Sequence, residues 1–148
     1  MAALFFSYSH KDEDLRDRLE THLAMLKREG IIETWHDRRI TAGDELAGVI
    51  DEKLEKADLI LLLVSADFLS SNYCFEIEMA RALERHQCKE ARVIPIILRP
   101  CDWHRAPFGK LLVAPKDGKP VVSWPDLDEA FVDVVRQIRA ALPSKKQA

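Results

Sequence analysis

The chain has 148 residues, 47% of them hydrophobic, and its 22 basic and 25 acidic residues give a net charge of -3. These values suit one domain with one core, and the near balance of charge gives no reason to expect a nucleic-acid-binding surface. Three cysteines without paired spacing or a signal peptide predict a reducing cytoplasm, and no apolar run approaches the roughly 18 residues of a membrane span.

Apolar stretches of strand length alternate with amphipathic stretches of helical period, which is typical of a parallel sheet covered by helices on both faces. Ser9 with Asp12, and Thr41 with Asp44, have capping-box spacing at the start of two helices, and Gly30 is placed to end the first of them. The expected strands are 3–9, 31–36, 58–65, 91–98 and 119–124. The expected helices run from Ser9 to about 29, from Thr41 to 54, over 73–86 and over 128–142. We therefore predict one α/β domain over residues 1–142, a three-layer sandwich with a five-stranded parallel sheet, and a polar tail at 143–148.

In such a sheet, ligands bind outside the carboxyl ends of the strands. Polar segments follow four of the expected strands and should meet at one end of the sheet: 7–14, 35–45, 65–74 and 99–108. The third segment leads into SSNYCFEIEM, where Glu76 and Glu78 lie in an otherwise apolar run. These two carboxylates are the first candidates for chemistry.

Four segments resemble, in order, motifs of the TIR domain, the module named for Toll and interleukin-1 receptors. FFSYSHKDED is similar to the first-strand motif, and WHDRRITAGDEL to the loop after the second strand. LLLVSADFLSSNYC is similar to the third strand with its serine and aromatic-cysteine motif, and RVIPIILRPCDW to the fourth strand with its internal proline. The resemblance implies a flavodoxin-like fold with five strands.

The resemblance implies one of two functions. Many bacterial TIR domains cleave NAD+ between nicotinamide and ribose and release ADP-ribose or a cyclic ADP-ribose. Others are adaptors that only associate with further TIR domains. We expect NAD+ glycohydrolase activity, with NAD+ as substrate and no cofactor or metal. We also expect head-to-tail self-association, a trigger in a sensor domain or partner protein outside this chain, and a role in bacterial defence against phage.

In the family, the catalytic residue is a glutamate on the helix after the third strand. The usual spacing W-C-x-x-E, counted from Tyr73, reaches Ile77, whereas counting back from the alanine-leucine pair that follows the glutamate reaches Glu78. One extra residue near the start of the helix would reconcile the counts. An α-helical projection places Glu76 closer than Glu78 to the apolar stripe. We predict Glu78 as catalytic and keep Glu76 as the alternative.

A fixed carboxylate suits this chemistry, because the ribose becomes a cation of oxocarbenium type as nicotinamide leaves. The resemblance implies further contacts with the dinucleotide from Phe6, Ser7, Tyr8, Ser9, Arg38, Arg39, Asp44, Ser65, Tyr73 and Cys74. Of these, Arg38 and Arg39 have the guanidinium geometry that suits a pyrophosphate. Cys74 is expected to pack rather than to act as a nucleophile.

Other kinds of site are not predicted. The five histidines lack metal-ligand spacing, and the chain has neither GxGxxG nor a P-loop. A phosphoacceptor receiver domain would share the sheet and the acidic residues after its first strand. It would also need an aspartate after the third strand and a lysine after the fifth, where this chain has Ser65 and Ser123 or Trp124.

Overall fold

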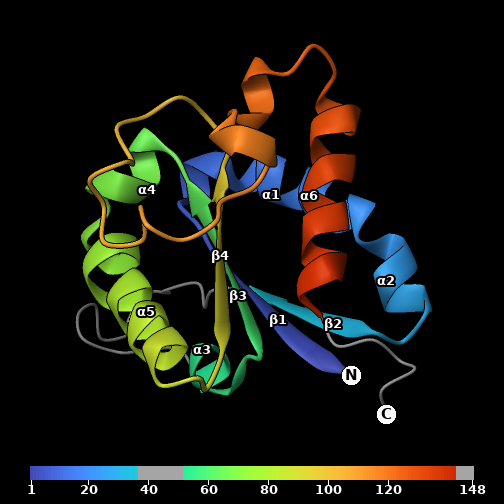
Figure 1. Cartoon of the computed structure of the whole chain (residues 1–148), viewed down its shortest axis with the longest axis horizontal. Coiled ribbons are helices and arrows are strands. Elements are labelled where there is room, and N and C mark those ends of the chain that lie inside the picture. The colour runs from blue at the N-terminus through green and yellow to red at the C-terminus, as the bar shows by residue number, and fades with distance from the viewer. Residues whose placement is uncertain (37–51, 143–148) are drawn as a thin grey trace.

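The computed structural model describes residues 1–36 and 52–142. Its centre is a parallel sheet in the order β2-β1-β3-β4 (Figure 1). The strands are β1 (Ala2–Ser7), β2 (Ile32–His36), β3 (Leu59–Val64) and β4 (Arg92–Ile97). All residues of β3 are buried, as expected for a central parallel strand covered on both faces.

Helices cover both faces of the sheet, so the predicted layers are present. Alternate residues of the strands, such as Leu4 and Leu61, pack against α1 (Glu13–His22), α2 (Ala24–Arg28) and α6 (Leu127–Ala141). The other strand residues pack against α3 (Glu52–Lys56), α4 (Ala66–Ser70), a π-helix η2 (Asn72–Met79) and α5 (Ala80–Gln87). Figure 1 shows α4 and α5 on one side of the sheet and α6 on the other. Among the described residues, no helix has the length and apolar character needed to cross a bilayer.

The helix expected from Ser9 to about residue 29 is divided into three parts. A 3-10 turn, η1 (His10–Asp12), precedes α1, and Leu23, with φ -86 and ψ 3, separates α1 from α2. Gly30 ends α2 as predicted: its φ is +70, and its N–H donates to the Lys27 carbonyl at 3.0 Å. Glycine adopts this left-handed conformation without the penalty of a Cβ.

The prediction of a fifth strand over 119–124 is wrong. Val121–Ser123 form a 3-10 turn, η4, and the sheet has four strands in the described part of the chain. Pro120 and Pro125 flank this turn. A proline cannot donate to a strand ladder, which disfavours a paired strand between them. A second 3-10 turn, η3 (Lys116–Gly118), lies just before it.

Several hydrogen-bonding groups on the outer edge of β4 have partners without a full strand beside them. Val93 donates its backbone N–H to His86 Nδ1 at 3.0 Å, and Pro95 has no N–H to offer. Ala114 donates to the Pro95 carbonyl at 2.9 Å and accepts from Ile97 N–H at 2.8 Å, forming an isolated bridge. The edge is therefore protected against pairing with another strand.

Candidate functional site

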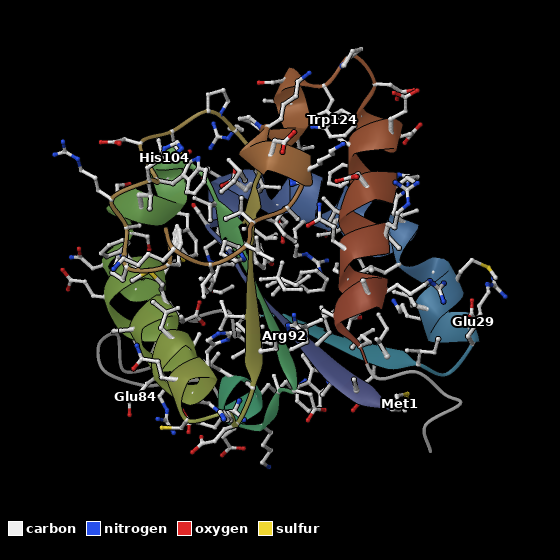
Figure 2. All side chains as sticks on the ribbon, in the orientation of Figure 1. Met1, Glu29, Glu84, Arg92, His104 and Trp124 are labelled. Carbon is white, nitrogen blue, oxygen red and sulfur yellow. The ribbon has the colours of Figure 1, made fainter. Side chains whose placement is uncertain are left out.

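The segments after β1 and β3 meet at the carboxyl end of the sheet, as expected. We call residues 7–12, 65–79 and 99 the rim. Figure 2 shows His104 and Trp124 at this end of the molecule, and Glu84 near the opposite end. Ser7, the last residue of β1, donates its hydroxyl to Glu78 Oε1 at 2.7 Å. This bond joins residues 71 positions apart and lies in a buried environment.

The helical form of residues 72–79 decides which glutamate faces inward. Glu78 is 0% exposed, whereas Glu76 lies on the exposed surface. The projection that favoured Glu76 is wrong because it assumed an α-helical period. A π-helix bonds residue i to i+5 and accommodates one more residue than an α-helix in the same turn. The π-helix thus supplies the extra residue that the two spacing counts around Glu78 require.

The start of η2 is attached to the segment after β1. Ser71 caps the helix by accepting the backbone N–H of Cys74 at 3.1 Å. Cys74 is 3% exposed, and its thiol donates to the Tyr8 carbonyl at 3.3 Å. Cys74 therefore packs between two rim segments, and Tyr73 beside it is half-buried.

A second group of contacts centres on Asp12, which the sequence analysis considered as part of a capping box and among the acidic residues that a receiver domain would have. Its carboxylate accepts from the Ser65 hydroxyl and forms an ion pair of 2.8 Å with Arg99. Ser65 also caps α4, an unpredicted helix, by accepting from Phe68 N–H at 3.1 Å. Asp67 binds Arg99 as well; its hydrogen bond, with the charge of Asp12, raises the pKa of the Arg99 guanidinium despite partial burial. Sequence analysis did not single out Arg99, although it follows the segment expected as the fourth strand.

The other predicted contact residues take different places. Phe6 and Tyr8 are buried in the core, and the Arg16 guanidinium lies 5.2 Å and 5.6 Å from their ring centroids. Ser9 caps η1 by accepting from Lys11 N–H at 3.3 Å. The remaining predicted contacts lie outside the described residues: Arg38, Arg39 and Asp44.

The position of Glu78 is chemically unusual. Removing a carboxylate from water costs several kcal/mol unless hydrogen bonds or charges compensate it, so an apolar side chain would suit an interior position better. Here the carboxylate is held in one orientation at the end of a strand, where ligands bind in open α/β sheets. In residues 1–36 and 52–142, no three His, Cys, Asp or Glu side chains group together as a metal site would require.

Comparison with known proteins identifies relatives of the whole domain. A model of the TIR domain family matches residues 4–141. An uncharacterized protein of Sinorhizobium fredii, y4lF, is 62% identical over 141 residues, which are 95% of this chain and 44% of that protein. The chain thus spans less than half the length of this curated relative.

Solved structures show the same fold. The TIR domain of the Toll-related receptor TRR-2 from Hydra magnipapillata has a TM-score of 0.57 and 19% identity, over 94% of this chain and 99% of that one. The TIR domains of the activated Roq1 resistosome, which recognises the effector XopQ, have a TM-score of 0.57 and 19% identity, over 93% and 99%. At this identity, the likeness concerns the fold.

Proposed function

Since this chain belongs to the TIR domain family, we propose that it is an NAD+ glycohydrolase with Glu78 as the catalytic carboxylate. The family includes NAD+-cleaving enzymes and non-catalytic adaptors. The observation that favours catalysis is the fully buried Glu78, oriented by the Ser7 hydroxyl at 2.7 Å. A solvated helix residue would need neither this burial nor this partner.

In the proposed reaction, the bond between ribose C1′ and the pyridinium nitrogen breaks, and its electron pair leaves with neutral nicotinamide. Glu78 binds the ribose hydroxyls and stabilises the positive charge that develops on the sugar. Attack by water gives ADP-ribose and releases a proton, and attack by the adenine ring gives a cyclic product. Ser7 holds the carboxylate in the required orientation. The proposed dinucleotide contacts are Ser9, Ser65, Tyr73, Cys74, Arg38, Arg39 and Asp44, with Phe6 and Tyr8 supporting them from the core.

The burial of Glu78 also supports a proposed dependence on assembly. A carboxylate that is 0% exposed cannot reach a ribose until the rim opens. We propose that head-to-tail association of domains drives this opening, because a contact can shift an equilibrium only by binding one state better than the other. A sensor domain or partner protein outside this chain would then control a cytoplasmic effector of anti-phage defence, and prevent uncontrolled loss of NAD+.

Nicotinamide release tests the proposal directly. Purified protein, dilute and at assembling concentrations, is incubated with NAD+, and products are separated by chromatography, which also distinguishes linear from cyclic ADP-ribose. Glu78→Gln should abolish release, and the matched exposed variant Glu76→Gln should leave it unchanged. Loss with Glu76→Gln alone would transfer the catalytic role to Glu76.

The adaptor function remains the second candidate, because the Ser7–Glu78 bond also joins β1 to η2 and so could serve the fold alone. In that case no nicotinamide would be released at any concentration. The domains would still associate, which sedimentation or light scattering would detect.

A further inference from the structure

Asp12 stands where an aspartate ordinarily caps a helix, but its carboxylate does not cap α1. It is the N-cap residue of α1 and makes no side-chain bond to the helix backbone. Its side chain is 1% exposed and instead binds the Ser65 hydroxyl and the Arg99 guanidinium. The usual local reason for an aspartate at this position is therefore missing.

These two partners connect Asp12 to the neighbouring strands. Ser65 directly follows β3, and Arg99 lies two residues after β4. Arg99 also binds Asp67 on α4, so one guanidinium joins the first turn of that helix to Asp12. The carboxylate thus anchors the chain that leaves β1 to the ends of both β3 and β4.

The segment from Ser7 to Asp12 is consequently held at three points. Ser7 contacts Glu78 at 2.7 Å, and the Tyr8 carbonyl accepts from the Cys74 thiol at 3.3 Å. These two contacts join the segment to η2, and the Asp12 contacts fix its far end. Loosening the far end should weaken the first two contacts, since only four residues lie between Ser7 and Asp12.

We propose that Asp12 is a positioning residue, which acts through Ser65 and Arg99 to hold the segment after β1 against η2 and so fixes the orientation of Glu78. The inference rests on the proposed NAD+ cleavage for its effect on rate. Its structural part, the attachment of Tyr8 to Cys74, is measurable without any activity.

The experiment uses the Cys74 thiol as a reporter of this attachment. Cys88 and Cys101 are replaced by serine, which leaves Cys74 as the one cysteine, and Asp12→Asn is introduced in that background. An asparagine keeps the size and can still accept from Ser65, but it loses the charge that attracts Arg99. We expect Ellman's reagent to label Cys74 about tenfold faster, and kcat for nicotinamide release to fall about tenfold with KM within about twofold.

Arg85→Lys is the matched control. Arg85 is buried like Asp12, but it lies on α5 and binds the Leu54 and Ala57 carbonyls at 2.7 Å and 2.8 Å. Loss of these two hydrogen bonds in Arg85→Lys should lower the free energy of unfolding without changing the rate of Cys74 labelling or kcat. Equal acceleration of labelling in Arg85→Lys and Asp12→Asn would show a general loss of stability and overturn the proposal.

Three further outcomes are decisive. Unchanged labelling in Asp12→Asn would overturn the proposal even if activity fell, and faster labelling with unchanged kcat would overturn the catalytic part. If wild-type protein releases no nicotinamide but Asp12→Asn still exposes Cys74, the attachment stands and the proposed function fails. Should Asp12→Asn not fold, Arg99→Gln removes the charged partner of Asp12 instead, and the same readouts apply.

Discussion

Both ends of the sheet bury polar or charged side chains, but their partners differ in kind. At the amino end, the buried Arg85 donates to the backbone carbonyls of Leu54 and Ala57 at the end of α3, and its one side-chain partner in the described part of the chain is the exposed Glu90, at 3.5 Å. At the rim, the contacts of Glu78 with Ser7 and of Asp12 with Ser65 and Arg99 join side chains to side chains.

This difference separates structural from functional explanations. The last carbonyls of a helix lack partners within it, so a buried arginine that binds them is explained by the fold alone. The Ser7–Glu78 hydrogen bond joins two side chains, and two apolar residues could replace the pair. Burial of charge by itself therefore does not identify a site, whereas the kind of partner indicates one.

The largest expected effect on stability is at the amino end. Arg85→Met leaves the Leu54 and Ala57 carbonyls without their buried donor, and should lower the free energy of unfolding by about 3 kcal/mol. Urea denaturation followed by circular dichroism measures this. Nicotinamide release per folded molecule should not change, and a selective loss of activity would break the distinction between the two ends.

Glu20 offers an intermediate test, because its partners are side chains but it is only partly buried. Its burial opposes ionisation, but hydrogen bonds from Thr34, Lys27 and Arg16 dominate and lower its pKa from 4.5 to about 2. A pKa that is lower in the folded state gives stability that is present above pH 4.5 and is lost as the pH falls toward 2.

Glu20→Gln should therefore lower stability by about 2 kcal/mol at pH 7, after allowance for partial solvent screening, and by progressively less below pH 4.5. Urea titrations of both proteins between pH 7 and pH 3 measure the difference. A constant difference across this range would contradict the role of ionised Glu20. Nicotinamide release at pH 7 should be unchanged in Glu20→Gln, because Glu20 and its hydrogen-bond partners lie outside the rim.

A smaller stability effect is expected when the pair at the rim is replaced as a unit. In Ser7→Ala with Glu78→Met, both groups of this hydrogen bond are removed together, so stability should stay equal or rise by about 1 kcal/mol. Activity should be lost completely. A stability loss as large as that of Arg85→Met would show that the pair serves the fold, and would support the adaptor function.

The sequence predicted the layers better than the rim. The apolar run of β3 and the leucines of α1 and α2 carry periodic signals, and these segments formed the expected strand and helices. The fifth strand failed because apolar character around Val121 was weighed above the flanking prolines. Asp12 and Arg99 were missed because their contacts join residues 32 or more positions apart, and no local pattern records such a contact.

The assignment of Glu78 depended on a family spacing that the chain did not follow, and periodicity alone favoured Glu76. The reason is the π-helix, since a projection at α-helical period assigns the wrong face to every residue beyond the extra one. The two family spacings around Glu78 indicated one extra residue near the start of the helix. They did not indicate that the helix would accommodate this residue by forming a π-helix.

Two single-residue deletions, one in η2 at the rim and one in α5 toward the amino end of the sheet, test whether the π-helix holds one extra residue. The deletion at the rim is expected to have the smallest effect. Removal of Ile77 leaves Cys74 and Glu78 at the C-x-x-E spacing of the family, and should convert η2 to an α-helix without moving Glu78 relative to Met79 and Ala82. Since a displacement of about 1 Å can cost about 100-fold in rate, nicotinamide release within about tenfold of wild type would show that Glu78 keeps its place.

Removal of Glu84 from α5 is the control: it turns the preceding residues by about 100° relative to Arg85 and should cost about 3 kcal/mol, as Arg85→Met does. If both deletions destabilise the protein equally, the π-helix does not contain a removable residue, and the spacing of Glu78 needs another explanation.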